Sequence, residues 1–469
     1  MKKILNNLLP QNSFVKGASI LVGGTAFSQL ILIAASPILT RLYSPDDFGV
    51  LSVYVSILAI ILIVSSLRYD LAIPLPDKNE DAYHLVILSL LITLTFSLLL
   101  CLVIFLYKDN IFGFLENTGI KEFIWFLPLG IIIGGSYLIF LQWSVREKLF
   151  KSISISKFWQ AISTVSIQIF LYPLGVISLI GGHVVGQFFG FLRLFTTKRI
   201  RIDPKRIIQL ARENYRFPFF SAPAGLLRVT GKQMTPIVLA AIFNPVAAGL
   251  YALTLRVLIM PASLIGGAVG QVFYSDARRA HKDGSLKDLV RQIHLNLSKI
   301  SLPFSIFLIL TGPYLFSFIF GNQWSDSGVF AGILAPWIYL EFVSSPITTL
   351  TAVLNKQREG LIFHIILFLL RVTALYFGYV VDDLILTIIY LSIANTLWRF
   401  IFLLWLFKLS GNRISTLFID SIRSLISSVV LLLPILISTY VFQNYLVFGY
   451  ALSFLMAVIY YTKLLRKAY

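Results

Sequence analysis

The sequence has a single cysteine, Cys101, so an intramolecular disulfide is impossible and no thiolate metal site is indicated. Its five histidines are scattered, without the HExxH or a comparable spacing of metal ligands. Charged residues make up only 13% of the chain, and the 21 acidic residues are outnumbered by 39 basic ones. Ordinary soluble domains carry about one quarter charged residues. These shortages argue against a metal centre, a bound cofactor and a soluble fold.

Apolar sequence takes the place of the missing charge, because 57% of the residues are hydrophobic. The runs 85–107, 300–320 and 384–407 are each about as long as the roughly 20 residues that cross a bilayer as a helix. In lipid the backbone groups must be satisfied within the segment, and the runs lack the alternation of a membrane barrel. The sequence therefore predicts an all-α integral membrane protein.

Apolar runs bounded by charged or turn residues mark the predicted transmembrane spans. There are fourteen of them, near 14–39, 48–67, 84–107, 123–143, 158–175, 177–197, 217–242, 247–272, 295–319, 330–353, 361–379, 384–407, 424–441 and 446–462. We expect the first to be a retained helix rather than a signal peptide, because its apolar stretch is too long and lacks a cleavage pattern. Only the turn signal YPLG separates the fifth from the sixth, so one kinked unit is the alternative there.

The distribution of Lys and Arg orients these spans. With the N-terminus inside, most basic residues fall in cytoplasmic segments, and the outer loops carry only Arg41, Lys108 and Lys121. Both termini are therefore predicted to be cytoplasmic. The basic loops 197–216 and 276–294 need no nucleic acid partner, because topology and anionic lipid headgroups account for them. The outer loops are too short to house an enzyme.

One polar interruption occurs twice. YSPDDFG at 43–49 and FNPVAAG at 243–249 each hold an aromatic, a small polar residue, a proline and a glycine four residues later. A second pair follows in the same order, WSVREKLF at 143–150 and LNKQREGLIF at 354–363. The two matches suggest an ancient duplication, and chance is the alternative. A duplication would give two parallel six-helix lobes around a central cavity. We assign these lobes to 1–200 and 201–410, with two additional helices in 411–469.

Charged residues also occur inside predicted spans. The cations are Arg228, Lys232, Arg256, Arg371 and Arg399, and the one acidic residue is Glu341. A charge at mid-bilayer costs at least about 2.5 kcal/mol, so such side chains usually face an interior or a wet cavity. Five cations exceed one carboxylate, and a transported anion would neutralise the surplus.

Several of these side chains have a second interpretation. Arg399 is as well explained by snorkelling to the inner headgroups, and one of the other cations can pair with Glu341. Asn395, four residues before Arg399, is either a helix-packing residue or a substrate contact. Trp337 and Tyr339 flank Glu341 closely enough to stack on a sugar.

The segments PILTRLYSPDDFGVLSVYVSIL, LQWSVREKLFK and NYRFPFFSAPAGLL resemble those of polysaccharide flippases of the multidrug/oligosaccharidyl-lipid/polysaccharide (MOP) exporter superfamily, and are most similar to the Wzx type. The resemblance implies a secondary transporter that moves an undecaprenyl-pyrophosphate-linked oligosaccharide to the outer leaflet of a bacterial inner membrane. Polymerase and glycosyltransferases of the same pathway would be its partners. It also implies that Arg228, Lys232, Arg256 and Arg371 line a cationic cavity, with Glu341 as the candidate for ion coupling.

Other functions fit the residues less well. Fourteen spans are typical of the related lipid II flippases, so that subgroup is the main alternative. A drug exporter of the same superfamily would carry buried carboxylates and few buried cations. A polysaccharide polymerase or ligase would need a long outer loop, and a scaffold would not keep cations in its core.

Overall fold

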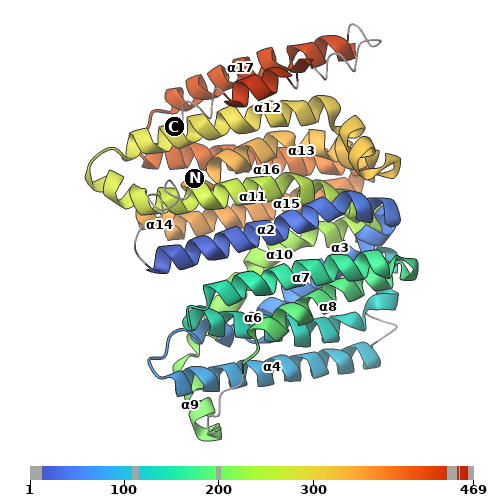
Figure 1. The fold of residues 1–469 in the computed structure, drawn as a ribbon, viewed down its shortest axis with the longest axis vertical. Coiled ribbons are helices and arrows are strands. Elements are labelled where there is room, and N and C mark those ends of the chain that lie inside the picture. The colour runs from blue at the N-terminus through green and yellow to red at the C-terminus, as the bar shows by residue number, and fades with distance from the viewer. Residues whose placement is uncertain (1–12, 108–115, 197–201, 441–451, 454, 463–469) are drawn as a thin grey trace. The chain divides into compact units, whose positions relative to one another are not determined.

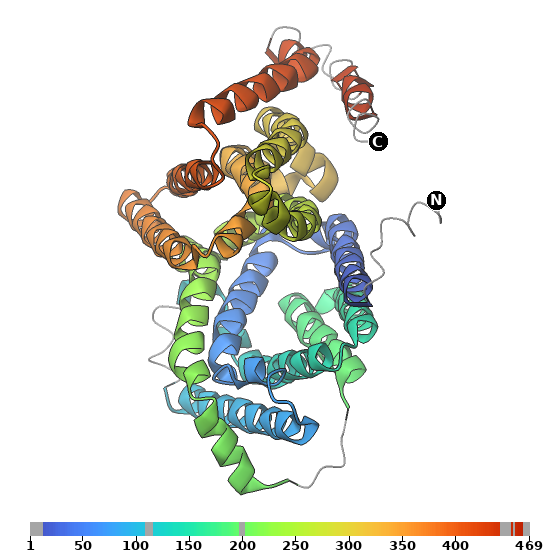
Figure 2. The ribbon, with the colours of Figure 1, turned by 90° about the vertical axis from the view of Figure 1, so that its left-hand side faces the viewer.

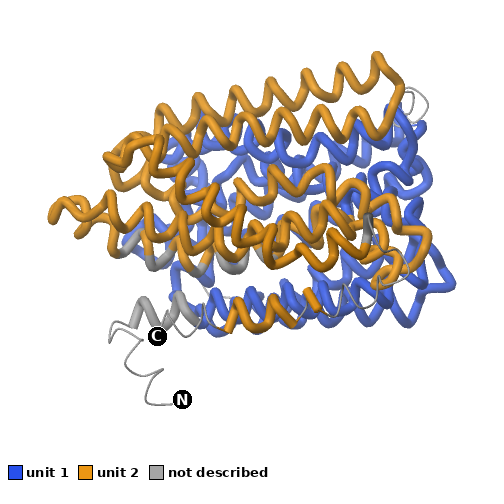
Figure 3. The backbone as a smooth tube through the Cα atoms, turned by 90° about the horizontal axis from the view of Figure 1, so that it is seen from above, with its two compact units in different colours: residues 1–252 blue, residues 253–469 orange. Residues whose placement is uncertain are grey.

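The computed structural model describes residues 13–107, 116–196, 202–440, 452–453 and 455–462 (Figure 1). Every regular element in this part of the chain is a helix, and no strand occurs there. The protein is therefore all-α, as predicted. The chain divides into two compact units, Met1–Ala252 and Leu253–Tyr469 (Figure 3). The lobe boundaries at 200 and 410 stay predictions.

Unit 1 is built mostly from long helices. Its helices are α2 (Ser13–Leu42), α3 (Pro45–Ser65), α4 (Asn79–Leu106), α6 (Phe126–Arg146), α7 (Phe150–Phe170), α8 (Val176–Leu194), α9 (Pro204–Glu213) and α10 (Ala222–Ile242), with the first residues of α11 (Pro245–Lys282). α2 packs along α7 and α7 along α8, while α3 packs along α10 (Figure 2). The short α9 packs against the N-terminal end of α4 (Figure 1).

Unit 2 continues α11 and adds a second set of long helices. They are α12 (Leu286–Phe320), α13 (Ser325–Ser344), the short α14 (Leu350–Val353), α15 (Gln357–Val381), α16 (Leu384–Leu409) and α17 (Ile414–Tyr440). Residues 455–462 are also helical. α12 packs along α13 and α17, and α16 packs along α13 and α15 (Figure 1).

The first thirteen predicted spans overlap these helices, whereas the fourteenth, 446–462, lies partly outside the described residues. Ten helices of the described residues are long and apolar enough to cross a membrane, and they confirm a multi-pass membrane protein. The fifth and sixth predicted spans are separate helices, α7 and α8, because Pro173 opens a turn and Gly175 adopts a positive φ of 59°. α7 and α10 are not among the ten, and the apolar part of α11, Pro245–Met260, is shorter than they are, so a total of fourteen spans stays a prediction.

Exposed apolar side chains show which faces meet lipid. On α15 only Gly360, Ala374, Leu375 and Gly378 are buried, while Leu369 is 56% exposed. A helix that is hydrophobic all round would expose a large apolar surface to water, and contact with lipid avoids that cost.

The repeated proline motif lies at the start of two helices that touch. The hydroxyl of Ser44 caps α3 through the Asp47 amide at 3.2 Å, and Asn244 Oδ1 accepts from the Ala247 amide at 2.9 Å. Pro45 and Pro245 each begin a helix, where a missing N–H is harmless.

The two glycines of the motif contact each other's helix reciprocally. A Cβ at Gly49 would collide with the carbonyl oxygen of Pro245, and a Cβ at Gly249 would collide with that of Pro45. Both contacts are within unit 1. The absence of a side chain at each glycine thus lets two backbones cross, as the motif predicts.

Candidate functional site

Arg228 and Lys232 lie one turn apart on α10, and both are exposed. The same stripe of this helix continues through Thr235 and Leu239, which are 2% and 0% exposed. The stripe is therefore covered toward the C-terminal end of α10 and open around the two cations. Arg228 has no carboxylate partner among the described residues.

A third cation reaches the same helix from the end of α3. A Cβ at Gly225 would lie 3.1 Å from Ile63 Cγ2 and 3.7 Å from Arg68 Nε. Arg68 adopts a left-handed backbone with φ of 62°, and its Nε is buried without a hydrogen-bond partner in the part of the chain described. Because Gly225 precedes Arg228 by about one turn, unit 1 adds Arg68 to the cations of α10.

Arg146, the arginine of the WSVREK motif, fixes the turn that follows Arg68. Its guanidinium donates to the carbonyl oxygens of Pro74 and Asp77 at 3.3 and 3.1 Å and to Asn79 Oδ1 at 3.0 Å. A planar fork of donors suits such a cluster of acceptors. The motif therefore has a structural role in this protein, and it orders the segment between α3 and α4.

The amphipathic α9 is held at this end of unit 1 by an ion pair. Arg206 Nε and Nη2 donate to the two carboxylate oxygens of Asp81 at 2.8 and 2.7 Å, and this hydrogen-bonded charge raises the pKa of Arg206. The Tyr69 hydroxyl donates to the Ala211 carbonyl at 3.1 Å. A π-helical turn, Phe217–Ser221, then leads into α10. Such turns allow a helix to change direction, so α9 anchors the start of the helix that carries the cations.

Arg399 forms an ion pair with Glu341. Its Nη2 donates to the Glu341 carboxylate, and its guanidinium lies 5.0 Å from the Trp398 ring centroid and 5.9 Å from that of Phe402. The residue is only 7% exposed. In unit 2 Glu341 therefore pairs with Arg399, and binding of the anionic headgroup by Arg399 stays a prediction.

Arg371 lies between two polar or aromatic groups of the same unit. Its Nε donates to Asn395 Oδ1 at 2.9 Å, and its guanidinium lies 5.9 Å from the Trp337 ring centroid. Trp337 is 5% exposed. Asn395 therefore bridges α15 and α16, and Trp337 contacts a cation.

Tyr339 takes part in helix packing. Its hydroxyl donates to Ser421 Oγ at 3.4 Å and lies 3.2 Å from Ser298 Oγ. Arg256, in the unit 2 part of α11, is half-buried. Stacking of Trp337 and Tyr339 on a sugar and anion binding by Arg256 and Arg371 stay predictions.

The described residues include no group of three or more His, Cys, Asp or Glu side chains that could hold a metal ion. Arginine and lysine outnumber acidic residues among the charged side chains inside the predicted spans, and these groups bind phosphate and carboxylate. Sequence reasoning missed Arg68 because a cation at a helix end is ordinarily a sign of topology. Its left-handed backbone, which the sequence does not reveal, directs it toward α10.

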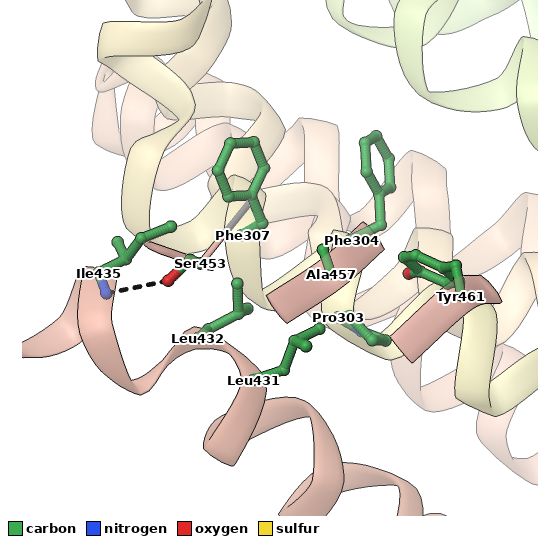
Figure 4. Close-up of a pocket in the computed structure, with 9 residues that line it drawn as sticks. All are labelled: Pro303, Phe304, Phe307, Leu431, Leu432, Ile435, Ser453, Ala457 and Tyr461. Atoms are coloured by element: carbon green, nitrogen blue, oxygen red, sulfur yellow. Dashed lines mark hydrogen bonds between the residues drawn. The ribbon is translucent and has the colours of Figure 1, made fainter. Parts of the chain in front are cut away.

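A separate apolar cavity of about 330 Å³ lies in unit 2 (Figure 4). It is lined by Pro303, Phe304 and Phe307 of α12, Leu431, Leu432 and Ile435 of α17, and Ser453, Ala457 and Tyr461 near the C-terminal end. Ser453 Oγ accepts a hydrogen bond from the Ile435 amide at 3.2 Å, so this hydroxyl already has a protein partner. The cavity therefore suits hydrocarbon rather than the charged part of a ligand.

Solved structures of membrane transporters share this fold. The lipid II flippase MurJ in an inward closed conformation is similar, with a TM-score of 0.74, 13% identity, and coverage of 96% of this chain and 99% of that one. An inward-facing multidrug resistance MATE family transporter of the MOP superfamily matches with a TM-score of 0.60 and 15% identity, over 82% and 95% of the two chains. The class is thus a multi-pass membrane protein that shares the fold of these two transporters.

A family model described as a polysaccharide biosynthesis protein matches residues 38–328, more than half of the chain. The protein therefore belongs to this polysaccharide biosynthesis family. The Wzx-like resemblance in the sequence is consistent with both findings. A sequence comparison with curated proteins gives no match.

Proposed function

We propose that this protein flips an undecaprenyl-pyrophosphate-linked oligosaccharide repeat unit from the cytoplasmic to the periplasmic leaflet of the bacterial inner membrane by alternating access. The observation that carries the proposal is Arg228, an exposed cation without a carboxylate partner among the described residues, one turn before Lys232 on a helix of a polysaccharide biosynthesis protein with a flippase fold. The charge of Arg228 is costly in a bilayer unless an anion neutralises it. A pyrophosphate supplies that anion.

Arg68 extends this pair toward the predicted cytoplasmic end of α10. A headgroup arriving from the inner leaflet would meet Arg68 first and then the two cations of α10. Guanidinium groups bind phosphate oxygens through paired N–H donors, and Lys232 adds a point charge. Arg256 and Arg371 remain candidates for further contacts to the headgroup, and Trp337 and Tyr339 for contacts to the sugar.

An ion gradient would drive the movement, and Glu341 is the candidate for coupling in unit 2. Protonation of Glu341 would remove the charge that pairs with Arg399. The pair would then separate, because a neutral carboxyl no longer offsets the desolvation of the guanidinium.

The pathway partners would be glycosyltransferases that build the lipid-linked unit and a polymerase that consumes it. The predicted position of both termini in the cytoplasm agrees with the excess of Lys and Arg in the cytoplasmic loops.

A lipid II-type flippase is the second candidate. It is favoured by the TM-score of 0.74 over 96% of this chain with the lipid II flippase MurJ. Expression in cells depleted of their own lipid II flippase separates the two candidates. Restored growth would support the second candidate, and failure to restore growth by a protein that makes surface polysaccharide would support the first.

The double variant Arg228→Ala/Lys232→Ala tests the proposal. We expect surface polysaccharide to disappear while the protein still accumulates in the membrane. The matched control is Arg278→Ala/Lys282→Ala, which removes two exposed cations at the same spacing from the end of α11. Normal polysaccharide from the α10 variant, or equal loss from the control, would overturn the assignment.

A further inference from the structure

His183 lies near the middle of α8 and is half-buried in unit 1. Its Nε2 lies 2.9 Å from the side-chain amide nitrogen of Gln187, one turn later on the same helix. In this orientation of the amide its nitrogen donates, so Nε2 accepts and carries no proton. The imidazole is therefore neutral here, with its proton on Nδ1.

The amide of Gln187 has an unused acceptor. Gln187 is 9% exposed, and its Oε1 is buried without a hydrogen-bond partner among the described residues. Gly134 of α6 faces this oxygen, since a Cβ at that position would come 2.5 Å from it. A larger residue would displace the amide. Gly134 of α6 thus leaves room for Gln187 Oε1, an acceptor to which the neutral imidazole donates no hydrogen bond.

The other neighbours of His183 carry few titratable groups. The Tyr54 ring of α3 meets the imidazole edge to face, with ring centroids 6.3 Å apart and an angle of 84°. The Tyr54 hydroxyl is occupied, because it donates to the Phe126 carbonyl at 3.0 Å.

Most charged and titratable side chains on the elements that pack around α8 lie in other contacts or at the surface, and the buried Tyr137 of α6 packs beside Gly190 of α8. Asp47 caps α3, Arg146 binds the turn before α4, Lys157 of α7 donates to Thr25 Oγ1 at 2.9 Å, and Arg193 of α8 lies 5.0 Å from the Trp159 ring centroid. The remainder are Asp46 of α3, Tyr137 of α6, the exposed Lys151 of α7 and the exposed Tyr172 that follows it. None of these groups is a described hydrogen-bond or ion-pair partner of His183.

We propose that His183 binds a proton during transport, and that Gln187 serves both protonation states through rotation of its amide. This inference rests on the proposed function, since it couples proton binding to the binding of a lipid-linked pyrophosphate. The proton adds to the Nε2 lone pair, which the Gln187 N–H releases. The amide then turns over, and its Oε1 accepts from the new Nε2–H. One side chain thereby satisfies the neutral imidazole and the imidazolium in turn.

Charge explains the coupling. An imidazolium inside a membrane span is costly, and an anion bound in the same unit lowers that cost. Binding of the anionic headgroup therefore favours protonation. By linkage, protonation strengthens headgroup binding by the same factor.

The test uses the full chain in nanodiscs, with undecaprenyl pyrophosphate as the probe. Its dissociation constant is measured between pH 5.5 and 8 for the wild type and for His183→Gln. The pyrophosphate itself titrates in this range, and that contribution is common to both proteins. We expect the wild-type affinity to rise on acidification by at least about fivefold more than that of the variant, the low end of typical coupling factors.

Three further variants sharpen the result. Gln187→Glu places a carboxylate beside the imidazole, and we expect the midpoint of the pH profile to move up by about one unit. His281→Gln removes an exposed imidazole from the end of α11 and should leave the wild-type profile unchanged. Glu341→Gln removes the competing candidate for coupling. A profile flattened by this change and not by His183→Gln would overturn the inference.

The outcomes separate this inference from the proposed function. Binding that needs Arg228 and Lys232 but has the same pH profile in wild type and His183→Gln overturns the inference alone. A wild type that does not bind the probe, or binding that survives Arg228→Ala/Lys232→Ala, overturns both. Proton uptake on binding, measured by calorimetry in buffers of different ionisation enthalpy, should be smaller in His183→Gln than in the wild type, because only the contribution of the pyrophosphate remains.

Discussion

The two compact units treat their internal charges differently. In unit 1, Arg228 is exposed on α10 and lacks a carboxylate partner among the described residues. In unit 2, Arg399 is bound by Glu341, and Asp420, which is 1% exposed, is bound by Arg291 at 2.7 Å. The difference teaches that a cation in an apolar helix is a candidate ligand only where the fold leaves it open.

The energetic reason is desolvation. A buried ion pair offsets the cost of removing both charges from water, and breaking it leaves one charge without compensation. An exposed cation does not stabilise the fold through a buried ion pair, so its presence in a membrane helix requires another explanation. Anion binding supplies one for unit 1.

The sharpest test of this contrast compares Arg399→Leu with Arg228→Leu. We expect Arg399→Leu to lower the free energy of unfolding by about 3 kcal/mol, because it leaves the Glu341 carboxylate unpaired. Arg228→Leu should change it by less than about 1 kcal/mol while abolishing surface polysaccharide. Unfolding in mixed micelles measures both values. The double variant Glu341→Leu/Arg399→Leu should recover most of the loss, and equal losses from the two single variants would remove the contrast.

The next largest effect concerns a feature that both units share. Gly49 crosses the backbone at Pro245 in unit 1, and Gly312 of α12 and Gly328 of α13 cross reciprocally in unit 2. Gly49→Ala and Gly312→Ala should each destabilise the protein by about 1–3 kcal/mol, because the added Cβ forces two backbones apart. The melting temperature in detergent reports this loss. Gly267→Ala, where a Cβ would meet nothing within 4 Å, is the control. A loss at Gly267 as large as at the crossings would contradict the explanation.

A smaller and local effect is expected at α9. Arg206→Ala removes the donors that hold this helix to Asp81, while the Tyr69 hydrogen bond remains. Amide hydrogen exchange within Pro204–Glu213 should become faster, with protection of α4 unchanged. Lys205→Ala, on the same helix, is the control, since its side chain is exposed. Unaltered exchange in Arg206→Ala would show that apolar contacts alone dock α9.

The smallest effect is predicted for the surface ion pair of unit 2. Lys356 Nζ lies 2.7 Å from Glu359 Oε1, and the two side chains are 43% and 39% exposed. Lys356→Ala should cost at most about 1 kcal/mol, because water and salt screen such pairs. The same unfolding assay applies. A loss comparable to that of Arg399→Leu would mean that exposure does not separate the two pairs.

Much of the fold follows from local sequence. Apolar runs of sufficient length predicted α3, α4 and α16 closely, because a helix is the only structure that satisfies its own backbone in lipid. The residues YPLG even marked the break between α7 and α8.

The site was predicted less completely. The sequence identified Arg228 and Lys232 as neighbours on one face, since four residues make about one helical turn. It did not identify Arg68, which follows α3, has a left-handed backbone conformation and lies next to α10. It also did not identify which of the several cations pairs with Glu341. Contacts between distant segments depend on helix rotation and register, which no local pattern encodes.

The sequence by itself determined that this protein is a helical membrane protein and which side chains are charged inside its helices, because hydrophobic length and residue type are local properties. Only the tertiary structure decided which of those charges are neutralised. The packing of α13 against α16 places Glu341 beside Arg399. On α10, neighbouring segments cover the residues after Lys232, while Arg228 and Lys232 themselves stay exposed. Neutralisation needs an ångström-scale approach between residues far apart in the chain, and packing alone provides it.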